Sequence, residues 1–139
     1  MDPSQVIIRP ARTDDATEIA RLVNEAGQGV ALQMWQAHAP DCMDVWAFAA
    51  GWIAERLDAE PYADAWVAVA DGRVAGFLSA RRLPRQPEPR IPDAPSFFAP
   101  VFELEALAPD SGYVNVLAVA PGDRGQGIGT RLLGFAERY

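Results

Sequence analysis

The stretch that most constrains the fold runs from residue 113 to residue 133, where an apolar segment leads through a glycine-rich turn into a helical pattern. The apolar part predicts a strand, three glycines within residues 125–129 predict a tight turn, and a helix is expected to begin at about Gly127 or Ile128. The first N–H groups of a helix have no partner inside the helix and lie at its positive end. Together with Arg124 they predict a site for an anion, most naturally a phosphate.

The spacing of the glycines narrows the kinds of phosphate site. A Rossmann fingerprint needs Gly-x-Gly-x-x-Gly early in the fold and an acidic residue about 20 positions later. The order here is Gly122-x-x-Gly125-x-Gly127-x-Gly129, late in the chain. A P-loop needs a lysine, and the sequence contains none. A nucleotide-phosphate binder that uses the same turn stays open, as does an ordinary connection between a strand and a helix.

One known pattern does fit, Arg124-x-x-Gly127-x-Gly129 after a strand that ends Leu117-Ala118-Val119. It resembles the acyl-CoA-binding motif of the GNAT N-acetyltransferases. The opening Ile8-Arg9-Pro10-Ala11-x-x-x-Asp15 is also similar to the start of that family. The resemblance implies a mixed α/β fold with a largely antiparallel central sheet flanked by helices, the GNAT acyl-CoA N-acyltransferase fold. It also implies an enzyme that moves an acetyl group from acetyl-CoA to a primary amine by direct transfer.

The resemblance assigns residues to acetyl-CoA. Backbone groups of Leu117, Ala118 and Val119 are expected to bind the pantetheine arm. Arg124 is expected either to contact phosphate or to pin the turn, unless it simply pairs with Asp123 or another neighbour. The residues expected to hold the pyrophosphate are Arg124, Gly125, Gln126, Gly127, Ile128, Gly129 and Thr130.

Direct transfer needs a group that takes a proton from the amine and one that gives a proton to the thiolate. The candidates are Asn115, which can orient a water, together with Tyr113 and Glu105, and Glu103 is a further acid nearby. Strand alternation predicts that Tyr113 and Asn115 share a face with Leu117 and Val119.

The single cysteine argues against a disulfide, a zinc cluster and a covalent acyl-enzyme. Cys42 has no second cysteine for a disulfide or a zinc cluster, so no metal is expected. No histidine is placed by the sequence to activate its thiol, and His38 is the only histidine. We therefore expect no covalent acyl-enzyme.

Composition limits the partners. With 139 residues, half of them hydrophobic, the chain predicts one domain, and its net charge of −7 argues against a nucleic-acid partner. No apolar run reaches about 18 residues, and Met1–Gln5 has no leader pattern, so we expect a cytoplasmic protein without a membrane segment. The acceptor is a small-molecule or peptide amine, and a homodimer is left open. The alternative function is a non-catalytic acyl-CoA-binding module.

Local patterns predict the remaining elements. A strand over Gln5–Pro10 is followed by a helix with Thr13 as its N-cap. The other predicted elements are a short helix over Val30–Ala39, an amphipathic helix over Met43–Leu57, a hairpin over Ala65–Ser79 that turns at Asp71-Gly72, a proline-rich segment over Arg81–Pro100 and a short helix over Val101–Ala108. The proline-rich segment is expected to lie outside the sheet and to flank the acceptor side.

The family's fold continues beyond the motif helix into further strands and another helix. Tyr139 is expected to fall within that motif helix. Residues 1–139 therefore resemble the N-terminal portion of a single GNAT domain that lacks the C-terminal strands and helix. Strand 113–119 should then be an exposed edge, and activity is expected only with the missing C-terminal part.

Overall fold

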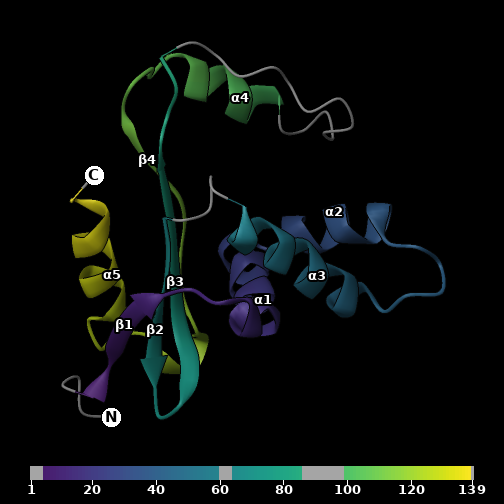
Figure 1. Cartoon of the computed structure of the whole chain (residues 1–139), viewed down its shortest axis with the longest axis horizontal. Coiled ribbons are helices and arrows are strands. Elements are labelled where there is room, and N and C mark those ends of the chain that lie inside the picture. The colour runs from purple at the N-terminus through teal and green to yellow at the C-terminus, as the bar shows by residue number, and fades with distance from the viewer. Residues whose placement is uncertain (1–4, 60–63, 86–98, 139) are drawn as a thin grey trace.

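The computed structural model describes residues 5–59, 64–85 and 99–138. Within them, one antiparallel sheet in the order β1-β2-β3-β4 is covered by helices on both faces (Figure 1). The predicted mixed α/β class is confirmed. The strands are β1 (Ile7–Pro10), β2 (Ala65–Ala70), β3 (Arg73–Arg82) and β4 (Gly112–Val119). The helices are α1 (Ala16–Ala26), α2 (Val30–His38), α3 (Val45–Asp58), α4 (Ala99–Ala106) and α5 (Ile128–Ala136), with short 3₁₀ helices η2 (Thr13–Asp15) and η5 (Pro121–Asp123).

The two faces of the sheet carry separate apolar cores. On one face, Ile128 and Leu132 of α5 pack with Leu78 of β3 (Figure 1). On the other face, Ile19 of α1 packs with Phe77 of β3. A third cluster around the buried Trp35 joins α2 to α1 and α3. Among the described helices, α5 packs on this face against the strands, so its position depends directly on them.

The predicted hairpin is confirmed. Asp71 and Gly72 have φ values of 53° and 73°, the positive values that a type I′ turn requires at both central positions. The turn joins β2 to β3 and places Arg73 as the first residue of the longer strand.

The start of the first helix differs from the prediction. Thr13 does not cap it, because the chain first forms the 3₁₀ helix η2 with Arg12 at its N-cap. The Asp15 carboxylate accepts a hydrogen bond from the Arg12 N–H at 2.8 Å and two from the Arg9 guanidinium at 2.8 and 2.9 Å. The Arg9 hydrogen bond holds the pKa of Asp15 below its usual value. An ion pair between Asp15 and Arg9 of β1 therefore fixes this helix start instead of a threonine cap.

A β-bulge interrupts the pairing of β3 with β4. Ser79 pairs with Val116 but the next residue, Ala80, pairs with Val114, so Asn115 is the extra residue of β4. The bulge reverses the expected alternation for Tyr113. It pairs with Arg81 and shares the face of Val116, whereas Leu117 lies on the α5 face opposite. The prediction that Tyr113 and Leu117 share a face is wrong for this reason.

The boundary between β3 and the proline-rich segment also differs from the prediction. Arg81 and Arg82 belong to β3 and pair with β4, so they lie inside the sheet and not in the proline-rich segment. Residues 86–98 of that segment lie outside the described residues. Helix α5 ends at Ala136, and Tyr139, which was expected to fall within it, lies outside the described residues. In the described parts of the chain, no helix is long and apolar enough to cross a bilayer.

Gly76 of β3 permits the close approach of α5 to the sheet. A Cβ atom there would lie 2.9 Å from Leu132 Cδ1, 3.1 Å from Ile128 Cγ2 and 3.3 Å from the Ala118 carbonyl oxygen. All three neighbours are buried, and one is backbone, so the site has little room to adjust. Glycine at this position therefore sets the distance between α5 and the strands.

We predict that Gly76→Ala lowers the free energy of unfolding by about 1–3 kcal/mol, because the added methyl overpacks the contact with α5. Chemical denaturation measures the change. Gly51→Ala in α3 is the control, because its Cβ meets no atom within 4 Å and alanine favours the helix by about 0.5–1 kcal/mol. Equal stability of the two variants would contradict this reading of Gly76.

Candidate functional site

The turn between η5 and α5 presents unpaired backbone donors. The first backbone hydrogen bond of α5 runs from the Arg131 N–H to the Gly127 carbonyl at 3.1 Å. The N–H groups of Ile128, Gly129 and Thr130 therefore have no acceptor within the helix. Gly127 is the N-cap residue with a φ of 82°, in the left-handed region that glycine adopts without strain. The predicted start of the helix is confirmed.

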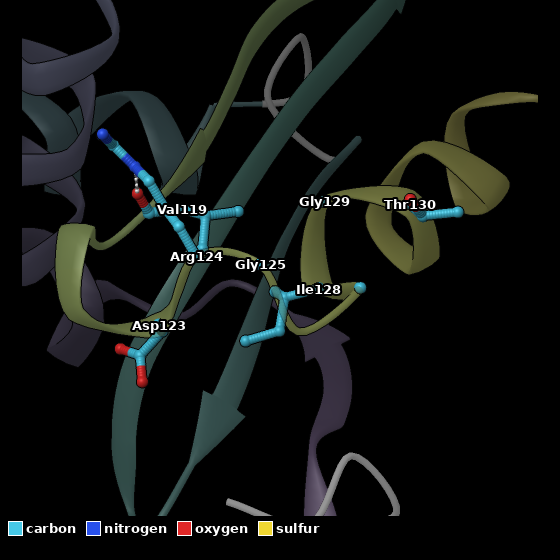
Figure 2. Close-up of a pocket in the computed structure, with 8 residues that line it drawn as sticks. Val119, Asp123, Arg124, Gly125, Ile128, Gly129 and Thr130 are labelled. Carbon is cyan, nitrogen blue, oxygen red and sulfur yellow. Dashed lines mark hydrogen bonds between the residues drawn. The ribbon is translucent and has the colours of Figure 1, made fainter.

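A shallow depression of about 280 Å³ lies in front of these donors (Figure 2). A Cβ atom built on Gly125 or Gly127 meets no atom within 4 Å, so both glycines border open space. Gln126 adds a buried side-chain oxygen that has no hydrogen-bond partner among the described residues. The lining residues are Val119, Asp123, Arg124, Gly125, Gly127, Ile128, Gly129 and Thr130.

The Arg124 side chain ties the turn to the end of the preceding strand. Its Nε donates to the carbonyl oxygen of Val119 at 3.1 Å, and Figure 2 shows its side chain directed away from Ile128 and Thr130. Its Nη2 lies 3.8 Å from Glu25 Oε2 at the end of α1. The sequence left three roles open for Arg124. This geometry fits two of them: Arg124 pins the turn through Val119, and it pairs with a neighbouring acid, Glu25.

Asp123 is fixed by a residue that sequence reasoning missed. Both of its carboxylate oxygens accept hydrogen bonds from Arg73, at 2.5 and 2.6 Å. These hydrogen bonds lower the pKa of Asp123 below its usual value, so the side chain stays ionised. The two residues are 50 positions apart, and only the Asp71-Gly72 turn hinted that Arg73 begins a strand.

The open edge of β4 continues the site. β4 is the terminal strand in the described sheet, as predicted. The Ala120 N–H bonds to the Ala75 carbonyl, so the ladder alternation turns the backbone of Ala118 toward β3 as well. The backbone groups of Leu117 and Val119 then face the open edge. Of the three residues expected to bind pantetheine, these two have outward-facing backbone groups.

A polar cluster lies at the other end of β4. Arg81 Nη2 of β3 donates to Glu105 Oε2 of α4 at 3.1 Å, and the Arg81 guanidinium lies 5.9 Å from the centre of the Tyr113 ring. Burial, together with the charge and hydrogen bonding of Glu105, raises the pKa of Tyr113 above its usual value. The structure therefore brings together two of the predicted catalytic residues and adds Arg81, which the sequence did not single out.

The other predicted candidates lie apart from this cluster. Asn115 is exposed at the bulge, where local backbone geometry departs from the regular ladder. Glu103 is exposed on α4. Cys42 is exposed, and the Nδ1 of His38 lies 2.8 Å from the carbonyl oxygen of Met34. Over the described ranges, no group of three or more His, Cys, Asp or Glu side chains is placed to hold a metal ion.

Comparison with known proteins identifies the family. A family model described as Acetyltransferase (GNAT) family matches residues 27–139. The chain belongs to the GNAT acetyltransferase family. It is an N-acetyltransferase domain, and the matched region contains the strand, the turn and the helix that the sequence analysis singled out. No curated protein sequence is significantly similar to this chain.

Solved GNAT structures share the fold. A ribosomal-protein-alanine N-acetyltransferase from Brucella melitensis biovar Abortus 2308 is 22% identical with a TM-score of 0.54, over 96% of this chain and 69% of that one. The aminoglycoside N-acetyltransferase AAC(6')-Iy in complex with CoA is 18% identical with a TM-score of 0.56, over 96% and 67%. A GNAT family acetyltransferase from Brucella melitensis in complex with acetyl-CoA is 19% identical with a TM-score of 0.52, over 95% and 67%.

We predict that Tyr113 ionises at a pH above the usual tyrosine value of about 10 and that Glu105→Gln lowers its midpoint. The substitution removes a nearby negative charge that disfavours the phenolate. Absorbance near the phenolate band measures the titration, with the Tyr113→Phe spectrum subtracted to remove the other tyrosines. Glu103→Gln on the exposed side of α4 is the control and should leave the midpoint unchanged. A midpoint insensitive to Glu105 would refute the coupling.

Proposed function

We propose that acetyl-CoA binds along the open edge of β4 with its pyrophosphate over the turn of residues 124–130, and that a primary amine attacks its thioester directly. The observation that carries this proposal is the N-terminus of α5, where the N–H groups of Ile128, Gly129 and Thr130 precede the first helical hydrogen bond and face the depression. A pyrophosphate carries the charge that such a helix end attracts. The relatives described as complexes with CoA and acetyl-CoA support the choice of ligand.

The backbone of β4 supplies the second part of the proposed site. The outward-facing N–H and C=O groups of Leu117 and the outward-facing N–H of Val119 match the amides of a pantetheine arm, which can pair with an open strand edge. Val119 also lines the depression, so the two parts are continuous. The thioester would then reach the region of the bulge at Asn115.

Tyr113 is the proposed proton donor for the leaving thiolate. The phenol of a tyrosine is protonated at neutral pH, as a general acid must be, and the upward shift of the Tyr113 pKa preserves that state. Glu105 orients the phenol and is held in turn by Arg81. The amide of Asn115 cannot accept a proton. We therefore propose that Asn115 orients a water molecule, which takes the proton from the amine. Cys42 is exposed and has no part in the proposed site, so the mechanism needs no acyl-enzyme step.

The acceptor is a small-molecule or peptide amine. Two relatives are named as aminoglycoside acetyltransferases and one as a ribosomal-protein-alanine acetyltransferase, so both classes are represented among similar folds. The net charge of −7 favours a cationic amine over a nucleic acid. We further propose that the protein is cytoplasmic. Turnover of acetyl-CoA separates this enzyme from a module that only binds it.

We predict that Gly127→Val abolishes CoA binding by the full-length protein. Valine is strained at the φ of 82°, and its side chain would enter the depression in front of the free N–H groups. Calorimetric titration measures the affinity, and circular dichroism checks folding. Gly134→Val, on the same helix where an added Cβ also meets open space, is the control and should keep its affinity. Normal CoA binding by Gly127→Val would sink the proposal.

We predict that Tyr113→Phe lowers kcat by about 10²-fold or more while the KM for acetyl-CoA changes little, because the phenol acts on the leaving group and not on binding. Steady-state kinetics with any amine that the full-length protein acetylates provide the measurement. An unchanged kcat, or a loss confined to KM, would remove Tyr113 from the mechanism.

A further inference from the structure

We propose that Arg73 is a positioning residue for acetyl-CoA, because its ion pair with Asp123 both holds the pyrophosphate turn and cancels a negative charge beside it. This inference rests on the proposed binding of acetyl-CoA at residues 124–130. It concerns Arg73, which lies 50 residues before Asp123, and Asp123 itself, whose side chain the sequence analysis did not assign to the cosubstrate.

The pair joins two distant parts of the fold. Arg73 is the first residue of β3, directly after the hairpin turn, and Asp123 is the last residue of η5, directly before Arg124. The two guanidinium nitrogens Nη1 and Nη2 each bond one carboxylate oxygen, at 2.5 and 2.6 Å. Such a two-pronged contact fixes orientation as well as distance. The end of η5 is therefore held against the hairpin at the point where the turn begins.

The same ion pair also neutralises a negative charge next to the proposed pyrophosphate site. The Asp123 side chain is only 2% exposed, yet the residue lines the depression in front of the free N–H groups. An uncompensated carboxylate beside an anion site opposes anion binding, because like charges repel. Arg73 engages both oxygens, so the pair as a whole carries no net charge. Its own side chain is 47% exposed, so the positive charge remains partly open to solvent and to an approaching anion.

The ligands that the ion pair affects distinguish this positioning role from general stabilisation of the fold. A pair that only stabilised the fold would affect every ligand of the site equally. A pair that positions the turn and neutralises Asp123 affects only ligands that carry the pyrophosphate. CoA and pantetheine provide this contrast, because pantetheine has the arm but no pyrophosphate.

The test compares Arg73→Ala with the double variant Arg73→Gln/Asp123→Asn in the full-length protein. Arg73→Ala leaves the Asp123 carboxylate uncompensated and should weaken CoA binding about tenfold or more, with pantetheine binding unchanged. The double variant is neutral and can keep a side-chain hydrogen bond, so it should recover most of the affinity for CoA. Arg82→Ala is the control, because Arg82 lies at the other end of β3 in an exposed ion pair with Asp110 at 3.4 Å.

Titration calorimetry of the four proteins with CoA and with pantetheine gives the outcomes. Equal CoA affinity of Arg73→Ala and the natural protein would overturn the inference while leaving the proposed function intact. Equal losses for CoA and pantetheine would also overturn it and reduce the pair to a fold-stabilising role. Failure of the natural protein to bind CoA would overturn the proposed function itself. If Arg73→Ala does not fold, Arg73→Gln alone against the double variant makes the same comparison, and the inference requires the double variant to bind CoA more tightly.

Discussion

The seating of α5 on the sheet is the contact on which the rest of the site depends. Ile128 and Leu132 are buried against β3 at Gly76, where the absence of a side chain lets the helix approach the strands. This contact fixes where the helix begins and therefore where its free N–H groups point. Arg73 and Arg124 hold the other side of the turn, one through Asp123 and one through the Val119 carbonyl. The turn is thus positioned from both ends before any ligand arrives, which lowers the ordering cost of binding.

The bulge at Asn115 divides β4 into two functional halves. Toward its C-terminal end, the strand offers the backbone of Leu117 and Val119 at an open edge next to the turn. Beyond the bulge, Tyr113 moves to the opposite face, where Arg81 and Glu105 meet it. A regular strand would have kept Tyr113 on the α5 face. The extra residue in β4 therefore places Tyr113 beside Arg81 and Glu105, while Leu117 and Val119 keep their backbone groups at the open edge.

Sequence patterns predicted the features that depend on the conformation of neighbouring residues. The glycine spacing gave the start of α5 to within one residue, and Asp71-Gly72 gave the hairpin, because positive φ values restrict the residue type strongly. The family followed from the same stretch. The antiparallel sheet and the open β4 edge were also predicted correctly.

The failures share another cause, since each depends on a contact that the local pattern does not reveal. Thr13 lost its expected capping role because Asp15 pairs with Arg9 of β1, six residues earlier. The face of Tyr113 depended on a change of pairing register that no local pattern reveals. Arg73 was missed because its partner lies 50 residues away. Side chains that act through tertiary ion pairs have no periodic signal in the sequence.

The central claim is that the free N–H groups at the start of α5 bind the pyrophosphate of acetyl-CoA. The most direct measurement is an amide-resolved NMR titration of the full-length protein with CoA. The account predicts that the amide signals of Ile128, Gly129 and Thr130 shift the most and become protected from hydrogen exchange, with smaller shifts at Leu117 and Val119. Saturable CoA binding that leaves those three amides unshifted, with the changes located elsewhere, would contradict it.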